Sequence, residues 1–343
     1  MPVFGREPRD WLIPRPEGLY CAPGDFFIDP RRPVARAVIT HAHSDHARAG
    51  HGAVLATPGT LALMAARMGS ASVAPGSQSL AYGRRLRLGA ARLSLAPAGH
   101  VLGSAQVVIE HAGRRAVISG DYKRSADPTC AAFEPVACDL FVTEATFALP
   151  VFRHPPPEQE IVRLLASLRL FPERAHLVGT YALGKCQRLI ALLRAAGYDR
   201  PIFLHGACAS VCETYRALGI DLGDLRPLPA GRAVAGGEVV LAPPGALADR
   251  WSRRLAEMLP AMASGWMALR QHARARGVEL PLVISDHADW DGLLATIAAT
   301  GAGTVWITHG PPEALMHVLS ARGVVAEPLG GAQPAARRGE EED

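Results

Sequence analysis

The alternation of apolar and polar residues predicts a run of short strands in the first part of the chain. Apolar runs bounded by glycine or proline predict strands over residues 25–29, 36–40, 84–88, 91–96, 106–110, 115–119 and 140–144. Helical spacing of apolar residues predicts a helix over residues 61–68, and residues 1–24 are predicted to be a loop-rich lead-in. Runs of strands with few helices favour sheets packed face to face.

The pattern changes after three consecutive prolines at residues 155–157. Predicted helices over residues 158–170, 185–196 and 209–218 alternate with predicted strands over 176–179 and 201–204, which is typical of a parallel sheet. Strands over 280–284 and 304–308 follow, with helices over 290–299 and 312–321. We expect residues 1–150 and 280–329 to form one domain, residues 151–279 to form a smaller α/β insert, and residues 330–343 to be a disordered tail.

Composition narrows the class of protein. A chain of 343 residues that is 49% hydrophobic has enough apolar surface for a packed core, and its net charge of +4 is compatible with a phosphate-bearing partner without demonstrating one. No apolar run approaches the roughly 20 residues that cross a bilayer, and the N-terminus is charged, so we expect a cytoplasmic protein. The six cysteines form no C-x-x-C pair, which argues against a disulfide scaffold and indicates buried thiols.

The strongest chemical signal lies at residues 38–46, which read VITHAHSDH. His41, His43, Asp45 and His46 leave the end of a predicted buried strand together. Neutral imidazole is the commonest metal ligand in proteins, and a nearby carboxylate can hold a second ion. The alternative is a polar surface loop, which the density of these groups disfavours.

Other predicted strands also run into ionisable groups, often beside a glycine that permits a sharp turn. These groups are His100, Asp121, Glu144, His287 and His309. Taken singly, each is more typical of a cap or turn residue. Their repetition at one strand end after another predicts a shared site.

The residues 41–46, HAHSDH, match the H-x-H-x-D-H motif of the metallo-β-lactamase superfamily, and Asp29, His100 and Asp121 follow in the order of its remaining core motifs. Glu144, His287 and His309 resemble three further motifs of the β-CASP branch, whose members are nucleases of RNA 3′ ends and of DNA crosslink and end repair.

Within that branch the resemblance is divided. Residues 99–104 with 120–122 resemble the messenger-RNA 3′-end cleavage nucleases, whereas residues 25–29 and 179–185 look more like the DNA-repair members. Between about residues 18 and 325, the chain is most similar to the bacterial ligase-associated DNA damage response exonucleases.

The resemblance implies an αββα sandwich with an inserted, smaller β-CASP-like α/β domain, and two divalent ions, Zn²⁺ or alternatively Mn²⁺ or iron. It implies one ion held by His41, His43 and His100 and a second by Asp45, His46 and His309, with Asp121 bridging. Asp29 would orient the histidine loop. Catalysis would then rest on Asp45, Asp121, His287 and Glu144.

In this scheme His287, oriented by Glu144, is the candidate general acid for the leaving 3′-oxygen. The alternative is a structural pair that links the two domains.

The chain contains only two lysines, Lys123 and Lys185. Lys185 closes a glycine-containing turn between a predicted strand and helix, where backbone N–H groups favour anions, so a phosphate could dock beside Lys185 and Thr180. Cys186 breaks the P-loop pattern, and an ordinary solvated lysine is the alternative. Lys123 could likewise contact phosphate or be a rim charge.

The function expected from this resemblance is a two-metal phosphodiesterase that hydrolyses DNA, as an exonuclease in end processing or repair, with DNA ligase and helicase repair proteins as partners. One alternative is the same chemistry on RNA 3′ ends, which His309 favours because DNA-acting relatives often carry valine at that motif. Another is a non-nucleolytic metallo-hydrolase, or a binding protein with a vestigial site. The insert, if it faces the site as in that family, favours a polymeric substrate.

Overall fold

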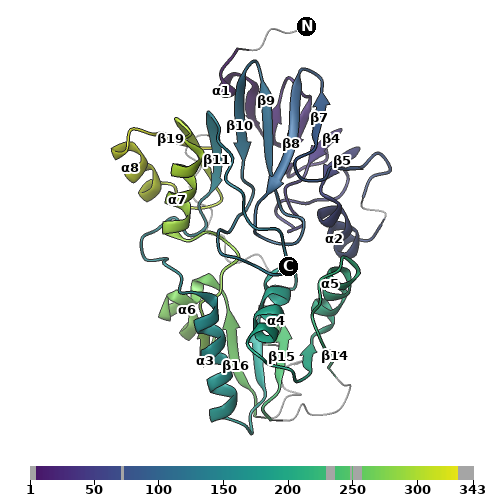
Figure 1. The fold of residues 1–343 in the computed structure, drawn as a ribbon, viewed down its shortest axis with the longest axis vertical. Coiled ribbons are helices and arrows are strands. Elements are labelled where there is room, and N and C mark those ends of the chain that lie inside the picture. Colours follow the sequence, from purple (N-terminus) through teal and green to yellow (C-terminus); the bar gives the residue numbers. More distant parts are fainter. Residues whose placement is uncertain (1–4, 71–72, 229–235, 248, 250–256, 331–343) are drawn as a thin grey trace. The chain divides into compact units, whose positions relative to one another are not determined.

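The computed structural model describes residues 5–70, 73–228, 236–247, 249 and 257–330 (Figure 1). These residues form two compact units. Unit 1 contains the described residues up to Pro150 and from His287 onward, and unit 2 contains those of Val151–Asp286. Both units combine helices and sheets, so the predicted α/β class is confirmed.

Unit 1 is built on two sheets. The first has six strands in the order β1-β2-β3-β4-β5-β6: Leu12–Arg15, Gly18–Cys21, Phe26–Ile28, Arg36–Val38, Ala53–Ala56 and Gln78–Ser79. The second has seven strands in the order β19-β18-β11-β10-β9-β8-β7: Val325–Pro328, Thr304–Thr308, Leu140–Glu144, Arg114–Ile118, Ala105–His111, Ala91–Pro97 and Arg85–Leu88. Four helices belong to this unit: α1 (Pro8–Trp11), α2 (Pro58–Met68), α7 (Trp290–Thr300) and α8 (Glu313–Ala321).

The two sheets of unit 1 share one apolar core. Leu19 and Val38 of the first sheet are buried in the same cluster as Leu93, Val107 and Ile118 of the second, so the sheets pack face to face as predicted. The other face of the seven-stranded sheet packs against α7 and α8. Each fully buried leucine or valine contributes about 1.5–3 kcal/mol to folding, so this shared core holds the two sheets of unit 1 against each other.

Strand direction decides where the polar groups meet. β10, β11 and β18 are parallel, and β8 runs the same way because it is separated from β10 by the antiparallel β9. The carboxyl ends of these strands therefore lie at one edge of the sheet. The loops that carry the candidate site residues leave from that edge and from the end of β4.

Unit 2 contains a parallel six-stranded sheet, as the βα alternation predicted. Its order is β14-β13-β15-β12-β16-β17: Leu225–Pro227, Ile202–Leu204, Val239–Ala242, His176–Gly179, Leu259–Ala263 and Leu280–Leu282. Its helices are α3 (Pro157–Leu170), α4 (Lys185–Ala195), α5 (Gly206–Ala217) and α6 (Arg270–Ala275), with 3₁₀ turns at Pro244–Leu247 and Gly265–Ala268. Leu177 and Val240 are fully buried, as expected for strands covered on both faces.

Two expectations about segments are wrong. Leu280–Leu282, predicted in the closing part of the first domain, pairs as β17 with β16 in unit 2, and the chain returns to unit 1 only at His287. A three-residue apolar run carries no information about which sheet it joins. Residues 1–24 are not only loop, because α1 and the antiparallel pair β1–β2 lie there. Apart from Gly330, the predicted tail over residues 330–343 lies outside the described residues.

Within the described part of the chain, no helix combines the length and apolar character needed to cross a membrane. All six cysteines are free thiols. Four of them, Cys21, Cys186, Cys208 and Cys212, are buried as expected, whereas Cys130 and Cys138 are half-buried.

Candidate metal centre

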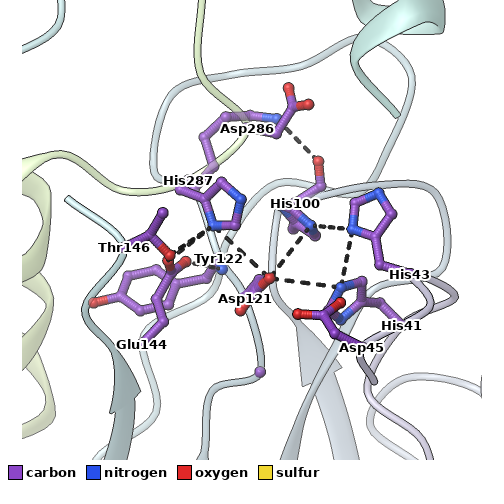
Figure 2. Close-up of polar contacts among 12 residues, drawn as sticks. His41, His43, Asp45, His100, Asp121, Tyr122, Glu144, Thr146, Asp286 and His287 are labelled. Atoms are coloured by element: carbon purple, nitrogen blue, oxygen red, sulfur yellow. Dashed lines mark hydrogen bonds and ion pairs between the residues drawn. The ribbon is translucent and has the colours of Figure 1, made fainter. Parts of the chain in front are cut away.

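The candidate site lies in unit 1 and is assembled from the carboxyl ends of five strands. β4 is followed by the histidine loop at residues 41–46, β8 by His100, β10 by Asp121 and β18 by His309, while Glu144 is the last residue of β11. Figure 2 shows side chains from several of these segments converging on Asp121. Residues that are far apart in the sequence therefore meet because their strands share a direction.

Three histidines form the first donor group. His43 Nδ1 lies 3.1 Å from His41 Nε2 and 3.0 Å from His100 Nε2 (Figure 2). Donor atoms of these histidines and of Asp121 all lie within 4.8 Å of one another. Four ligands around a tetrahedral zinc with Zn–N bonds of about 2.0–2.1 Å would be about 3.3 Å apart, close to the observed spacing.

Asp45, His46 and His309 form the second donor group, again within 4.8 Å of one another. Asp121 lies between the two groups. Its Oδ2 is 3.7 Å from His41 Nε2 and its Oδ1 is 3.4 Å from His46 Nε2, so each carboxylate oxygen faces a different group. The structure thus brings together all seven residues predicted as metal ligands, and the placement of Asp121 is the one a bridging carboxylate needs.

Two buried polar atoms test whether cations fit these groups. His46 Nε2 and Asp121 Oδ1 are buried and face each other at 3.4 Å, but they do not reach hydrogen-bond geometry. A divalent ion between the two groups would coordinate both atoms directly once the proton on His46 is displaced. The imidazole and carboxylate donors suit zinc, manganese or iron, so the residues fit the ions that the motifs implied.

Asp29 and Thr40 orient two of the imidazoles. Asp29 Oδ2 accepts hydrogen bonds from His46 Nδ1 at 2.7 Å and from the Thr40 hydroxyl at 2.6 Å, and Oδ1 accepts from the Thr40 N–H at 2.8 Å. Because the Thr40 hydroxyl proton goes to Asp29, its oxygen must accept from His41 Nδ1, which is 3.1 Å away. Both imidazoles then keep Nε2 for a metal. Asp29 was predicted in this role, whereas Thr40 was missed; its only signal was its place directly before His41.

Backbone conformation supports this packing. Gly120 has φ +57°, and a Cβ at this position would lie 2.7 Å from Cβ of Thr40, so only glycine lets the loop that carries Asp121 approach the histidine loop. Asp29 and His309 also have positive φ values, 42° and 53°. Such conformations are uncommon for residues with a side chain and concentrate at functional sites.

The pKa values of His41 and His46 shift in opposite directions because the two rings have different charged neighbours. Burial lowers the pKa of His41 well below its ordinary value, and the neighbouring His46 and His100 lower it further, so His41 is neutral near pH 7. Burial also lowers the pKa of His46, but the carboxylates of Asp121, Asp29 and Asp45 outweigh it and raise that pKa well above the ordinary value. Binding of a cation at His46 must therefore displace a proton.

His287 and Glu144 form an ordered pair beside the first donor group. Glu144 is fully buried and accepts hydrogen bonds from His287 Nδ1 at 2.8 Å, the Thr146 hydroxyl at 2.6 Å and the Tyr122 N–H at 2.7 Å (Figure 2). Burial raises the pKa of Glu144. His287 Nδ1 is 3.8 Å from Asp121 Oδ2, and the side chain is 21% exposed. Both members of the pair lie in unit 1.

The three residues predicted to bind phosphate are buried. Lys123 is 2% exposed and donates to Asp127 at 2.7 Å and to the His100 carbonyl at 3.2 Å, so it is an internal ion pair that supports the His100 loop. Lys123 is therefore not the rim charge that was offered as its alternative, and its phosphate contact stays a prediction. Lys185 is 5% exposed, 3.9 Å from Asp286 and over the ring of Tyr181, so it is not a solvated lysine. Thr180 is fully buried, and phosphate docking at these two residues stays a prediction.

Comparison with known proteins gives relatives of two kinds. No protein-family model matches the chain. A "Probable DNA ligase" from Opitutus terrae is 30% identical over 328 residues, covering 93% of this chain and 31% of that protein. "Ribonuclease TTHA0252" from Thermus thermophilus is 32% identical over 203 residues, covering 51% and 46%. "Endoribonuclease YSH1" from Saccharomyces cerevisiae is 32% identical over 136 residues, covering 34% and 17%.

The chain thus spans less than half the length of each of these curated relatives. A crystal structure of a protein of unknown function from Enterococcus faecalis V583 superposes with a TM-score of 0.56 at 13% identity, covering 81% of this chain and 76% of that one. That likeness concerns the fold alone. The relatives named as ribonucleases support the expectation of a metal-dependent nuclease and point to the metallo-β-lactamase/β-CASP nucleases that the motifs resemble.

Proposed function

We propose that the chain is a metal-dependent nuclease that hydrolyses phosphodiester bonds of DNA, acting as an exonuclease in end processing or repair. The observation that carries this proposal is the convergence of seven donors from separate strand ends into two groups that share Asp121. Two bound divalent ions would stabilise negative charge on a phosphoryl oxygen and lower the pKa of the attacking water. The finer assignment, an αββα sandwich with a β-CASP-like insert and two zinc or manganese ions, belongs to the same proposal.

The chain's own residues would act as follows. His41, His43 and His100 would hold one ion and Asp45, His46 and His309 the other, with one oxygen of Asp121 toward each. His287 would act in its imidazolium form: its Nδ1–H donates to Glu144, which stabilises the cation, and its Nε2 proton goes to the leaving 3′-oxygen. Tyr122 and Thr146 fix the Glu144 carboxylate and thereby the orientation of the His287 ring.

DNA is proposed as substrate because the relative named as a probable DNA ligase matches along 93% of the chain. A DNA ligase or helicase of DNA repair is the corresponding proposed partner. A specific observation favours RNA as a second candidate: the relatives named as ribonucleases match the chain at 32% identity, and His309 stands beside His46 with ring centroids 4.6 Å apart.

The deciding experiment incubates the purified protein with end-labelled DNA and RNA of matched sequence, with Zn²⁺ or Mn²⁺ added. A DNA ladder that shortens from one end is expected, and it should vanish with Asp121→Asn. Preferential cleavage of RNA would establish the second candidate. No cleavage of either polymer, together with hydrolysis of a small ester or lactam, would refute the nuclease proposal in favour of another metallo-hydrolase.

A further inference from the structure

Unit 1 carries a second polar feature at the opposite end of the strands from the donor groups. A hollow of about 710 Å³ lies at the edge where β8 and β10 begin and β7 and β9 end. It is lined by four arginines and two carboxylates: Arg87, Arg92, Arg114, Arg115, Glu110 and Asp139. Arg92 and Arg115 stand near the starts of β8 and β10, whereas His100 and Asp121 follow the ends of the same strands. At about 3.3 Å per residue, roughly 20 Å of strand separates the two.

The arginines form a cross-strand row. Arg87 stands directly opposite Arg92, Arg92 opposite Glu110, and Glu110 opposite Arg115. Directly opposed residues project from the same face, so these four side chains cross four adjacent strands side by side. The arginine-rich composition of the chain explains the number of arginines, but not their alignment in one row.

The row has more positive charge than it can neutralise internally. Glu110 is shared by Arg115, at 2.7 Å, and Arg92, at 3.6 Å. Arg114 is already paired with Asp139 and Glu7, each at 2.9 Å. Arg87 donates to the Gly89 carbonyl, and its opposite neighbour Arg92 carries the same charge. Like charges placed directly opposite destabilise a sheet, and a bound polyanion would remove that cost.

From this arrangement we infer that the row Arg87–Arg92–Arg115 is a second contact surface for the phosphate backbone of a nucleic acid, outside the metal centre. Three strand spacings of about 4.8 Å give a row of about 14 Å, long enough to contact two or more successive phosphates of one nucleic-acid strand. Guanidinium groups bind phosphate bidentately and without regard to sequence. This inference rests on the proposed function for the identity of its ligand, and it predicts that long substrates bind more tightly than short ones.

The test measures binding without cleavage. A fluorescent 30-nucleotide phosphorothioate DNA, which resists hydrolysis, is titrated by anisotropy at several salt concentrations. Arg87→Glu/Arg92→Glu should weaken binding about tenfold and reduce the slope of log affinity against log salt by about 1.4, since each lost single-strand phosphate contact removes about 0.7. The neutral pair Arg87→Gln/Arg92→Gln should give a smaller loss in the same direction.

The matched control is Arg32→Glu/Arg322→Glu, which makes the same charge change at two exposed arginines of unit 1. Equal losses of DNA affinity in both charge-reversed proteins would show a net-charge effect and overturn the inference. Unchanged DNA binding by the Arg87/Arg92 variants, with unaltered melting temperatures, would also overturn it. Tighter binding of a polyglutamate peptide than of the oligonucleotide would also overturn it, in favour of an acidic protein partner.

Cleavage separates this inference from the proposed function. On a three-nucleotide substrate, too short to reach from the donor groups to the row, Arg87→Glu/Arg92→Glu should retain wild-type turnover. On the 30-nucleotide phosphodiester, KM should rise with kcat unchanged. If the variant and the wild-type protein have equal KM values on the long substrate, the inference about the row is refuted and the proposed nuclease function is not. If the wild-type protein cleaves neither substrate but its DNA binding still depends on Arg87 and Arg92, the nuclease proposal is refuted and the inference about the row is not.

Discussion

Replacing Thr40 with valine tests whether one hydroxyl sets the proton positions of the metal centre. Thr40 is 1% exposed, and its hydroxyl donates to Asp29 at 2.6 Å and accepts from His41 Nδ1 at 3.1 Å. Valine keeps nearly the same shape but provides neither bond. His41 Nδ1 then has no acceptor at that position, and the tautomer that presents Nε2 to a metal loses its support.

The expected magnitude follows from those two bonds. A hydrogen bond to a charged group contributes about 1.5–3 kcal/mol, and an unsatisfied buried donor costs about 1–3 kcal/mol. We expect the free energy of unfolding of the metal-free protein to fall by about 2 kcal/mol. Loss of such a supporting partner typically weakens metal binding about 10–100-fold.

Two measurements on purified protein check this prediction. Metal affinity is obtained by competition with a chelating dye, and the free energy of unfolding by urea titration in the presence of chelator. Thr40→Ser, which retains the hydroxyl, is the control and should lose less than threefold in affinity. If Thr40→Val binds metal as tightly as Thr40→Ser does, the hydroxyl does not set the His41 tautomer and the reasoning is wrong.

Three further predictions concern single residues. Asp121→Asn should reduce metal stoichiometry and activity together, measured by elemental analysis and cleavage rate; full metal content would contradict its placement between the donor groups. His287→Ala should keep its metal but lower kcat at least about 100-fold, and an unchanged kcat would return the His287–Glu144 pair to a purely structural role. A hydrogen bond from Arg115 holds the pKa of Glu110 below its ordinary value. The ionised carboxylate therefore stabilises the fold at pH values above its unfolded-state pKa of about 4.3. This contribution is lost as the pH falls through the lower folded-state pKa. Urea titrations between pH 6 and pH 3 should therefore show less acid destabilisation for Glu110→Gln than for wild type.

Local patterns in the sequence were enough to select the seven side chains that the structure brings together. Residues 41–46 contain three histidines and an aspartate, which is a recognisable metal-site pattern. His100, Asp121 and His309 each follow an apolar strand by a few residues. These patterns are visible in the sequence because strand periodicity and turn residues are local properties of the chain. The parallel sheet of unit 2 was predictable for the same reason, since each helix separates two apolar strands.

Tertiary structure alone decided the features that depend on long-range pairing. Lys123 is a buried partner of Asp127 because its loop folds against the His100 carbonyl, and no local pattern distinguishes it from a surface lysine. Thr40 acts through Asp29, eleven positions earlier, and Leu280–Leu282 joins unit 2 by pairing with β16. Sequence periodicity reports which residues are buried, but the choice of neighbour and the direction of each hydrogen bond are fixed only when the sheets pack.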